Sequence, residues 1–253
     1  VNISYILYYK TDLLSIKILN FRWYFLIYIT GDKHGNISFF KKKEMKKLKK
    51  NDYLIITGDF GFFWNNSRQE IENLKFLMRQ PYKILFVDGT HENFNMIEKY
   101  PIVKFGGAKA RKIAHNIYHL LRGQVYIIEK KGIFTFGGGV SRDLQKMLDI
   151  NMWFEREMPS KEEFIEGAKQ LNQFGGKLDY IITHEPPTQI KGIINPDLKP
   201  NAVNIYLEQI AEQVTFDKWF FGYAHIDEEV RPNYFGVFNE LLPVNKKEKP
   251  RVF

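Results

Sequence analysis

Apolar runs that end abruptly in polar residues recur along the chain. The run from Trp23 to Ile29 predicts a buried strand, and the runs Tyr53 to Thr57 and Lys83 to Val87 repeat it. Two later runs, Tyr180 to Thr183 and Trp219 to Phe221, have the same form. Because helical segments lie between them, these strands indicate an α/β fold.

Helix starts are marked by two capping boxes. Ser67 with Glu70 predicts a helix that runs to about residue 79, and Ser160 with Glu163 predicts one that ends near Gly175. The remaining expected elements are helices at 93–99 and 202–213, short strands with glycine turns at 117–121, 125–129 and 133–136, and a hairpin around 231–242.

The polar residues that follow these strands are aspartates and histidines. The set is Asp32, His34, Asp59, His91, His184 and His225, which includes four of the six histidines in the chain. A single strand that ends in such residues could simply lead into an ordinary surface turn. In an open α/β sheet, however, the carboxyl ends of strands open onto the ligand crevice. Aspartate oxygens and neutral imidazoles together suit divalent ions such as Mn, Fe or Zn.

This combination of ligands suits phosphate chemistry. Two ions about 3.5–4 Å apart can clamp a phosphate and convert a water into hydroxide, and a carboxylate such as Asp59 can bridge them. A nearby histidine can donate a proton to the leaving oxygen. The sequence has no Gly-x4-Gly-Lys-Ser/Thr segment, so a nucleotide-binding P-loop is not expected.

The ordered motifs resemble those of the calcineurin-like metallophosphoesterase family, most closely its compact bacterial and phage-type members. The motifs are Gly31-Asp32-Lys33-His34, Gly58-Asp59-Phe60-Gly61, Phe86-Val87-Asp88-Gly89, Thr90-His91-Glu92, Leu121-Arg122-Gly123-Gln124-Val125, Thr183-His184 and Gly222-Tyr223-Ala224-His225. The resemblance covers about residues 24 to 244. It implies a four-layer α-β-β-α sandwich of two mixed β-sheets, with one or two divalent metal ions (Mn, Fe, Zn or Mg) at the strand ends. It also implies hydrolysis of a phosphate mono- or diester.

The resemblance also assigns roles by position. One metal would take Asp32, His34, Asp59 and His225. The second metal would share Asp59 and take His184, and His91 matches the histidine that assists the leaving group.

The chain departs from the family pattern at two second-metal positions. Thr90 stands where the family has asparagine, and Tyr223 stands where it has histidine. A threonine hydroxyl is a poor ligand, and a neutral tyrosine coordinates only if the metal removes its proton. Three alternatives stay open: one tight ion with a weak second one, a degenerate phosphate- or nucleic-acid-binding module without turnover, or a Tyr223 phenolate ligand. The intact first-metal set favours retained, reduced activity.

The formal net charge of +8 is concentrated in a lysine run at residues 41–50, which holds seven lysines. Met45 and Leu48 are three residues apart and can anchor one helical stripe, so the lysines are expected on a solvated face. No aromatic residues interleave with them to stack on bases, which argues against a nucleic-acid site. Such charge still steers anions.

The chain has no cysteine, which fits a reducing cytoplasm. The apolar stretch before residue 29 contains Lys10, Asp12 and Lys17, so neither a signal peptide nor a membrane span is expected. We therefore expect a cytoplasmic phosphoesterase domain at 23–244, an N-terminal extension at 1–22 and a loose basic tail at 245–253. Its partner would be a phosphorylated substrate (phosphoprotein, nucleotide or nucleic acid), and its oligomeric state is open.

Three weaker features are interpreted as structural. His115 and His119 have the spacing of two ligands on a helix, but they lie in an expected strand. The glycines at 137–139 with Arg142 could cradle a phosphate, although a sheet-to-loop turn is favoured. Arg142 and Trp153 could also form a wall of the substrate cleft within 140–159, with ordinary loop packing the favoured role.

Overall fold

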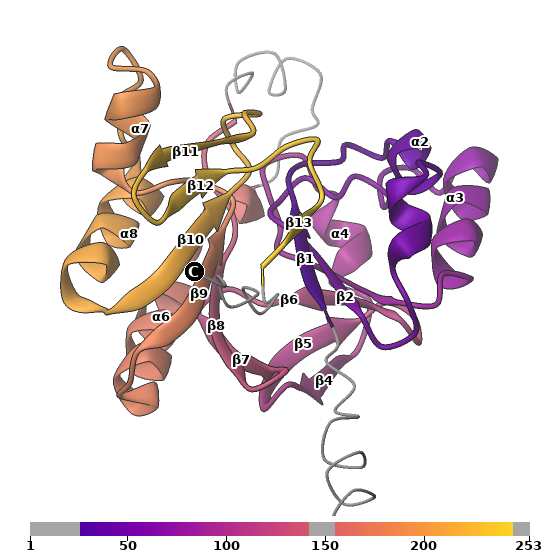
Figure 1. Cartoon of the computed structure of the whole chain (residues 1–253), viewed down its shortest axis with the longest axis horizontal. Coiled ribbons are helices and arrows are strands. Elements are labelled where there is room, and N and C mark those ends of the chain that lie inside the picture. The colour runs from indigo at the N-terminus through magenta and orange to yellow at the C-terminus, as the bar shows by residue number, and fades with distance from the viewer. Residues whose placement is uncertain (1–25, 142–154, 245–253) are drawn as a thin grey trace, which may run out of the picture.

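Two β-sheets lie against each other in the computed structural model, which describes residues 26–141 and 155–244 (Figure 1). The first sheet has seven strands in the order β13-β1-β2-β3-β6-β5-β4. These strands are β1 (Ile27–Thr30), β2 (Tyr53–Ile56), β3 (Lys83–Phe86), β4 (Ile102–Phe105), β5 (Ala108–Lys112), β6 (Ile117–Leu120) and β13 (Leu242–Pro243). β1, β2, β3 and β6 are parallel, whereas β13, β5 and β4 are antiparallel to their neighbours.

The second sheet has six strands in the order β11-β12-β10-β9-β8-β7. They are β7 (Gln124–Ile128), β8 (Lys131–Phe136), β9 (Leu178–Thr183), β10 (Phe216–Phe221), β11 (Glu228–Arg231) and β12 (Tyr234–Gly236). β8, β9, β10 and β12 are parallel, and the outer strands β7 and β11 are antiparallel. Both sheets are therefore mixed.

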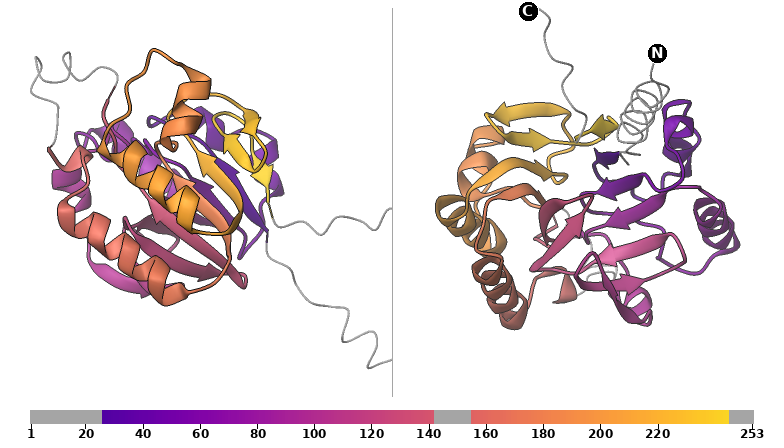
Figure 2. Two further views of the ribbon diagram at one scale, coloured as in Figure 1. Left: turned by 90° about the vertical axis from the view of Figure 1, so that its left-hand side faces the viewer. Right: turned by 60° about the horizontal axis from the view of Figure 1, so that its bottom comes forward.

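Helices cover the outer face of each sheet (Figure 2). The first sheet carries α2 (Ile37–Phe40), the 3-10 turn η1 (Glu44–Lys47), α3 (Arg68–Met78) and α4 (Phe94–Ile97). The second carries η2 (Glu155–Glu157), α6 (Lys161–Phe174), α7 (Thr188–Ile194) and α8 (Ala202–Gln213). The layers run helix, sheet, sheet, helix, which confirms the expected α-β-β-α sandwich of two mixed sheets.

Burial on both faces explains why the central strands are apolar throughout. In β2, Leu54 and Ile56 pack on the helices, whereas Ile55 points toward the second sheet. In β9, Tyr180 and Ile182 face the first sheet, and their neighbour Ile181 packs on the helices of the other side. Alternate side chains thus enter two different cores, as the period of a strand requires.

Most of the expected elements are confirmed, and the differences have local causes. Ser160 and Glu163 form a complete capping box, and α6 is followed by Gly175 in the left-handed conformation. Ser67 also caps its helix, but the Glu70 carboxylate accepts from backbone N–H groups at 64–66 and not from Ser67. Strands β4 and β5, in which exposed positions alternate with more buried ones, were not among the expected strands.

The expected final hairpin lies earlier than 231–242. It consists of β11 and β12, and the turn between them places Asn233 at φ 72°. The following segment crosses to the first sheet, where β13 pairs with β1. In the lysine run, Met45 and Leu48 are buried and the lysines are exposed, as expected, although the helical stripe is only the short turn η1.

The expected extension at 1–22 and the tail at 245–253 lie outside the described residues, as do Arg142 and Trp153. Within the ranges 26–141 and 155–244, no helix combines the length and apolar character needed to cross a bilayer.

Candidate metal centre

Five strand ends from both sheets converge on one site. Asp32 and His34 follow β1, Asp59 follows β2 and His91 follows β3, and these strands are parallel neighbours. His184 follows β9 and His225 follows β10, which are parallel neighbours in the second sheet. All six predicted site residues are therefore brought together, although their assignment as ligands and catalyst stays a prediction.

Asp59 lies at the centre of the first-sheet contacts. Its Oδ1 accepts the backbone N–H of His91 at 2.7 Å, and its Oδ2 lies 2.9 Å from Nδ1 of the same histidine. His34 Nε2 is 3.7 Å from Asp59 Oδ2. Asp59 thus both positions His91 and faces the histidine of β1.

Asp32 makes the corresponding contacts with the second sheet. Its Oδ2 is 3.1 Å from His225 Nε2, and its Oδ1 is 3.6 Å from His184 Nδ1. His225 Nε2 is also 3.3 Å from His34 Nε2. The two aspartates therefore stand between the histidines of the two sheets.

Three overlapping groups have the arrangement of metal ligands. In each group the potential ligand atoms lie within 4.8 Å of one another. The groups are Asp32 with His34 and His225, Asp32 with Asp59 and His184, and Asp59 with His34 and His91. The second group is fully buried, whereas the other two reach the surface through their histidines. The site therefore has a deep part and an exposed part that share both carboxylates.

Atoms in the deep group fit a cation. Asp32 Oδ1 and both ring nitrogens of His184 are buried, and no protein group in the described ranges forms a hydrogen bond with them. Buried polar atoms normally have partners, so Asp32 Oδ1 and one ring nitrogen of His184 are candidate ligands of bound cations.

Three glycines let the backbone approach these ligands closely. A Cβ atom on Gly58 would lie 2.1 Å from His184 Nδ1, and one on Gly222 would lie 2.0 Å from Asp32 Oδ1. A Cβ on Gly89 would lie 2.0 Å from Asp59 Oδ1. Any side chain at these positions would displace a potential ligand, which explains the Gly-Asp, Gly-Thr-His and Gly-Tyr-Ala-His patterns.

Three of the site residues have a left-handed backbone conformation. The φ angles are 45° at His34, 41° at Asp59 and 53° at His225. Such angles are unfavourable for residues other than glycine, and they cluster at functional sites. Here they turn the side chains back toward the common centre at the strand ends.

Electrostatics of the site favour positive charge at its centre. Burial opposes ionisation of Asp32 and Asp59, but the facing His184 holds the pKa of both carboxyls below the usual value. Burial opposes charge on His184 as well, yet the two carboxylates raise the pKa of His184 to about 10. The hydrogen bond with Asp59 raises the pKa of His91. The carboxylates thus attract cations into a buried place.

The two departures from the family pattern lie at the same site. Thr90 is buried, and its Oγ1 is 3.2 Å from His91 Nδ1. The Tyr223 ring meets the His184 ring edge-on at 5.9 Å between centroids. Lys191 Nζ lies 4.8 Å from the centre of the Tyr223 ring, so a cation is close to the side chain that replaces histidine.

Comparison with known proteins agrees with this geometry. Residues 25–227 match the family model of the calcineurin-like phosphoesterases. The chain belongs to the calcineurin-like phosphoesterase family. No curated protein matches the sequence. The crystal structure of phosphopantetheinyl hydrolase (PptH) from Mycobacterium tuberculosis is similar over 83% of this chain and 88% of that chain, with 13% sequence identity and a TM-score of 0.38.

A buried polar network that the sequence did not predict lies next to the candidate metal centre. Asp88 Oδ2 accepts from Arg122 Nε at 2.8 Å, and Asp88 Oδ1 is 2.9 Å from His119 Nε2. The role of His119 is thus structural and unrelated to His115, as its strand position indicated. Asp88 follows β3 as Asp59 follows β2, so the signal was present in the sequence.

Phe238 was missed as well, and nothing in the sequence marks it. Its ring stacks on His225 at 4.6 Å, and its carbonyl oxygen accepts from Lys33 Nζ at 2.5 Å. The glycines at 137–139 sit against Asp88, Glu157 and Glu185, where a Cβ would clash. Their role is close packing, which agrees with the interpretation as a turn.

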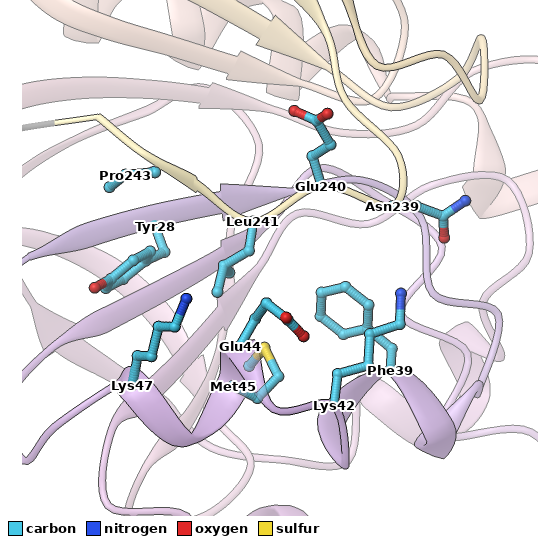
Figure 3. Close-up of a pocket in the computed structure, with 10 residues that line it drawn as sticks. All are labelled: Tyr28, Phe39, Lys42, Glu44, Met45, Lys47, Asn239, Glu240, Leu241 and Pro243. Atoms are coloured by element: carbon cyan, nitrogen blue, oxygen red, sulfur yellow. The ribbon is translucent and has the colours of Figure 1, made fainter.

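Two of the cavities in the described part of the chain differ in their relation to the candidate site. One, of about 440 Å³, lies between η1 and the segment before β13, and none of the candidate site residues lines it (Figure 3). The other, of about 410 Å³, is lined by His34 and His91. Of these two cavities, the second is therefore the one placed to receive part of a substrate.

Proposed function

We propose that the protein is a metal-dependent phosphoesterase that hydrolyses a phosphate mono- or diester. The observation that carries the proposal is the deep group of Asp32, Asp59 and His184, whose unpaired atoms fit a cation, next to His91. Family membership supports the same chemistry in general terms. The cytoplasmic location expected from the absence of cysteine is part of the proposal.

The residues present fit one tightly held divalent ion and a second, weaker one. Asp32, His34, Asp59 and His225 would hold the first ion, and Asp59 with His184 would hold the second. Ions bound there would supply Lewis acidity, which withdraws charge from phosphoryl oxygens and acidifies water. Mn²⁺, Fe, Zn²⁺ or Mg²⁺ would suit this mixed oxygen and nitrogen set.

His91 is the proposed general acid. Its Nδ1 is held by Asp59 Oδ2, which orients the ring and leaves Nε2 as the position that can carry a proton to the leaving oxygen. The raised pKa of His91, caused first by this hydrogen bond, increases the fraction of imidazolium near neutral pH. The side chain is 30% exposed, so a substrate can reach it.

Metal removal tests the proposal. Purified protein is expected to hydrolyse p-nitrophenyl phosphate or its diester in Mn²⁺, to lose this activity in excess chelator, and to regain it when Mn²⁺ is returned. Elemental analysis is expected to find one to two metal ions per chain. Absence of hydrolysis above the level of the chelated protein, together with absence of metal, would overturn the proposal.

The second candidate is a degenerate module that binds phosphate or nucleic acid without turnover. Thr90 and Tyr223, which lie against His91 and His184, favour it. For such a module we expect salt-dependent binding of DNA or RNA without cleavage. Turnover of either aryl phosphate by the metal-loaded protein would reject it.

Restoring the family ligands is expected to strengthen the second metal site. Thr90→Asn combined with Tyr223→His supplies a carbonyl oxygen and an imidazole next to His184. The second Mn²⁺ is therefore expected to bind at least tenfold more tightly. Changes to groups that support metal ligands typically alter metal affinity by about 10- to 100-fold. Calorimetric titration of metal-free protein with Mn²⁺ measures this. The two single variants are the controls, and an isotherm of the double variant equal to that of the wild type contradicts the prediction.

A further inference from the structure

A cavity lined mainly by uncharged residues begins at His34 and His91 and extends to α3. Its volume of about 410 Å³ falls in the range of roughly 300–1,000 Å³ that is typical of small-molecule sites. The far side is formed by the segment after Phe62 and by the first turns of α3. Since His91 is the proposed proton donor to the leaving oxygen, the leaving group of the substrate would lie in this cavity.

The segment that carries Trp64 is anchored in the core on one side. Phe62 and Phe63 are both buried, and their rings pack on Phe60 at 4.8 and 5.8 Å between centroids. Phe60 in turn follows directly after Asp59. The wall of the cavity is thereby tied to the strand end that supplies the central carboxylate.

Hydrogen bonds fix the other side of this segment. The buried Glu70 carboxylate accepts the backbone N–H groups of Trp64, Asn65 and Asn66. Asn93 Nδ2 donates to the Trp64 carbonyl oxygen at 2.7 Å. Because Asn93 lies two residues after His91, Trp64 is held at a fixed place relative to the proposed acid.

The Trp64 side chain is one of those that line the cavity. It is only partly buried, and no aromatic ring within 26–141 and 155–244 stacks on it. Trp219, by contrast, is fully buried and stacks on Tyr234 at 5.7 Å. An indole that lines a cavity can stack on a planar ring of a ligand.

The polar groups of the cavity suit an uncharged ring with donors and acceptors. Gln69 Nε2 donates to Asn73 Oδ1 at 3.0 Å, which leaves Gln69 Oε1 as an acceptor and Asn73 Nδ2 as a donor. The cavity lining includes no lysine or arginine. The charge of Glu70 is already satisfied by backbone N–H groups, so the lining favours neither a second phosphate nor a cation.

We propose that this cavity binds the base of a nucleotide, which stacks on Trp64 while its edge meets Gln69 and Asn73. The inference rests on the proposed function and names a nucleoside monophosphate as its substrate class. A nucleobase combines a planar ring with a donor and acceptor edge, and stacking on aromatic side chains is tolerant of base identity. The ribose then spans the distance between the base and the phosphoryl group at the metal centre.

The test compares two substrates that differ only by the base. In Mn²⁺, kcat/KM for adenosine 5′-monophosphate is expected to exceed that for ribose 5-phosphate at least tenfold. Trp64→Ala is expected to lower the ratio of kcat/KM for the nucleotide to kcat/KM for ribose 5-phosphate by roughly 5- to 100-fold, as loss of one base stack does. Trp64→Phe is expected to keep most of the preference. Ile71→Ala, at an exposed α3 position that does not line the cavity, is the matched control.

Each outcome decides the inference. If Trp64→Ala leaves the ratio of kcat/KM for adenosine 5′-monophosphate to kcat/KM for ribose 5-phosphate unchanged, base stacking on Trp64 is overturned. The phosphoesterase proposal then stays in place, whether or not both kcat/KM values fall. A higher kcat/KM for a phosphotyrosine peptide than for the nucleotide also overturns it. If neither sugar phosphate is hydrolysed, calorimetry with adenosine decides: binding that is lost in Trp64→Ala and kept in Trp64→Phe supports the site, and no binding by the wild type rejects it.

Discussion

Replacing Asp59 by asparagine is expected to lower kcat/KM for an aryl phosphate by about 10³-fold or more. Changing a group that only supports a metal ligand costs about 10- to 100-fold in affinity or activity, and Asp59 is placed to bind both ions directly. Asparagine keeps the shape of the side chain but has one oxygen and no charge, so it cannot bridge two cations. It also alters the contact that orients His91, which lies 2.9 Å from Asp59 Oδ2.

Steady-state kinetics and metal content measure this effect together. Asp179→Asn is the matched control, because Asp179 is also an aspartate bonded to a backbone N–H, that of Gly132, but it lies at the opposite end of β9 from His184. We expect Asp179→Asn to keep its metal and its activity, and Asp59→Asn to lose both. An Asp59→Asn protein that retained more than a tenth of the wild-type kcat/KM would show that Asp59 is not a ligand.

Most of the fold could be predicted from the sequence because the central strands of both sheets are buried on two faces. The runs that end at Thr57, Val87 and Thr183 are apolar at nearly every position, so their boundaries agree with β2, β3 and β9 to within about two residues. Strand β5 alternates between buried and exposed positions, β4 has no fully buried position, and both contain lysines, which gives them the composition of a loop. The position of β13 depends on pairing with β1, a contact between distant segments that no local pattern encodes.

The candidate site residues could be predicted from the sequence for a different reason. Its six side chains each follow a strand directly, so the topology of parallel neighbours brings them together even when their exact orientation is not known. The proposed base-binding cavity, by contrast, could not be predicted from the sequence. Trp64 lies in a segment without regular structure, and its backbone hydrogen bonds with Glu70 and Asn93 help to place it at the cavity that His91 also lines. Such contacts depend on the folded positions of three separate segments.

Replacing Arg122 by methionine is expected to lower the free energy of unfolding by about 3–5 kcal/mol, the usual effect of removing one partner from a buried ion pair. The Arg122 and Asp88 side chains are only 2% and 1% exposed. Arg122 donates to Asp88 through Nε and Nη2, and it also donates to the Glu163 carboxylate and the Arg156 carbonyl oxygen. Methionine fills part of the volume but leaves the Asp88 charge without its main partner.

Urea unfolding followed by tryptophan fluorescence measures the loss by linear extrapolation. Arg156→Met is the matched control, since Arg156 binds the same Glu163 but its side chain is 43% exposed, so a loss of no more than about 1 kcal/mol is expected. Equal losses in the two variants would contradict the prediction. Adding Asp88→Asn to Arg122→Met is expected to recover part of the stability, because it removes the uncompensated charge.

The pH dependence of the Arg122→Met effect gives a second readout with a definite sign. Burial opposes the charge on Asp88, but Arg122 and His119 hold the pKa of Asp88 well below its usual value in the folded protein. A carboxyl with a depressed folded pKa contributes stability above its unfolded pKa, which is about 3.9, and this contribution is lost as the pH falls. Without Arg122, burial raises the pKa of Asp88, and protonation then relieves the variant. The difference in unfolding free energy between wild type and Arg122→Met is therefore expected to shrink as the pH is lowered from 7 through about 4, and a constant difference would show that Arg122 stabilises the fold by packing and not by charge.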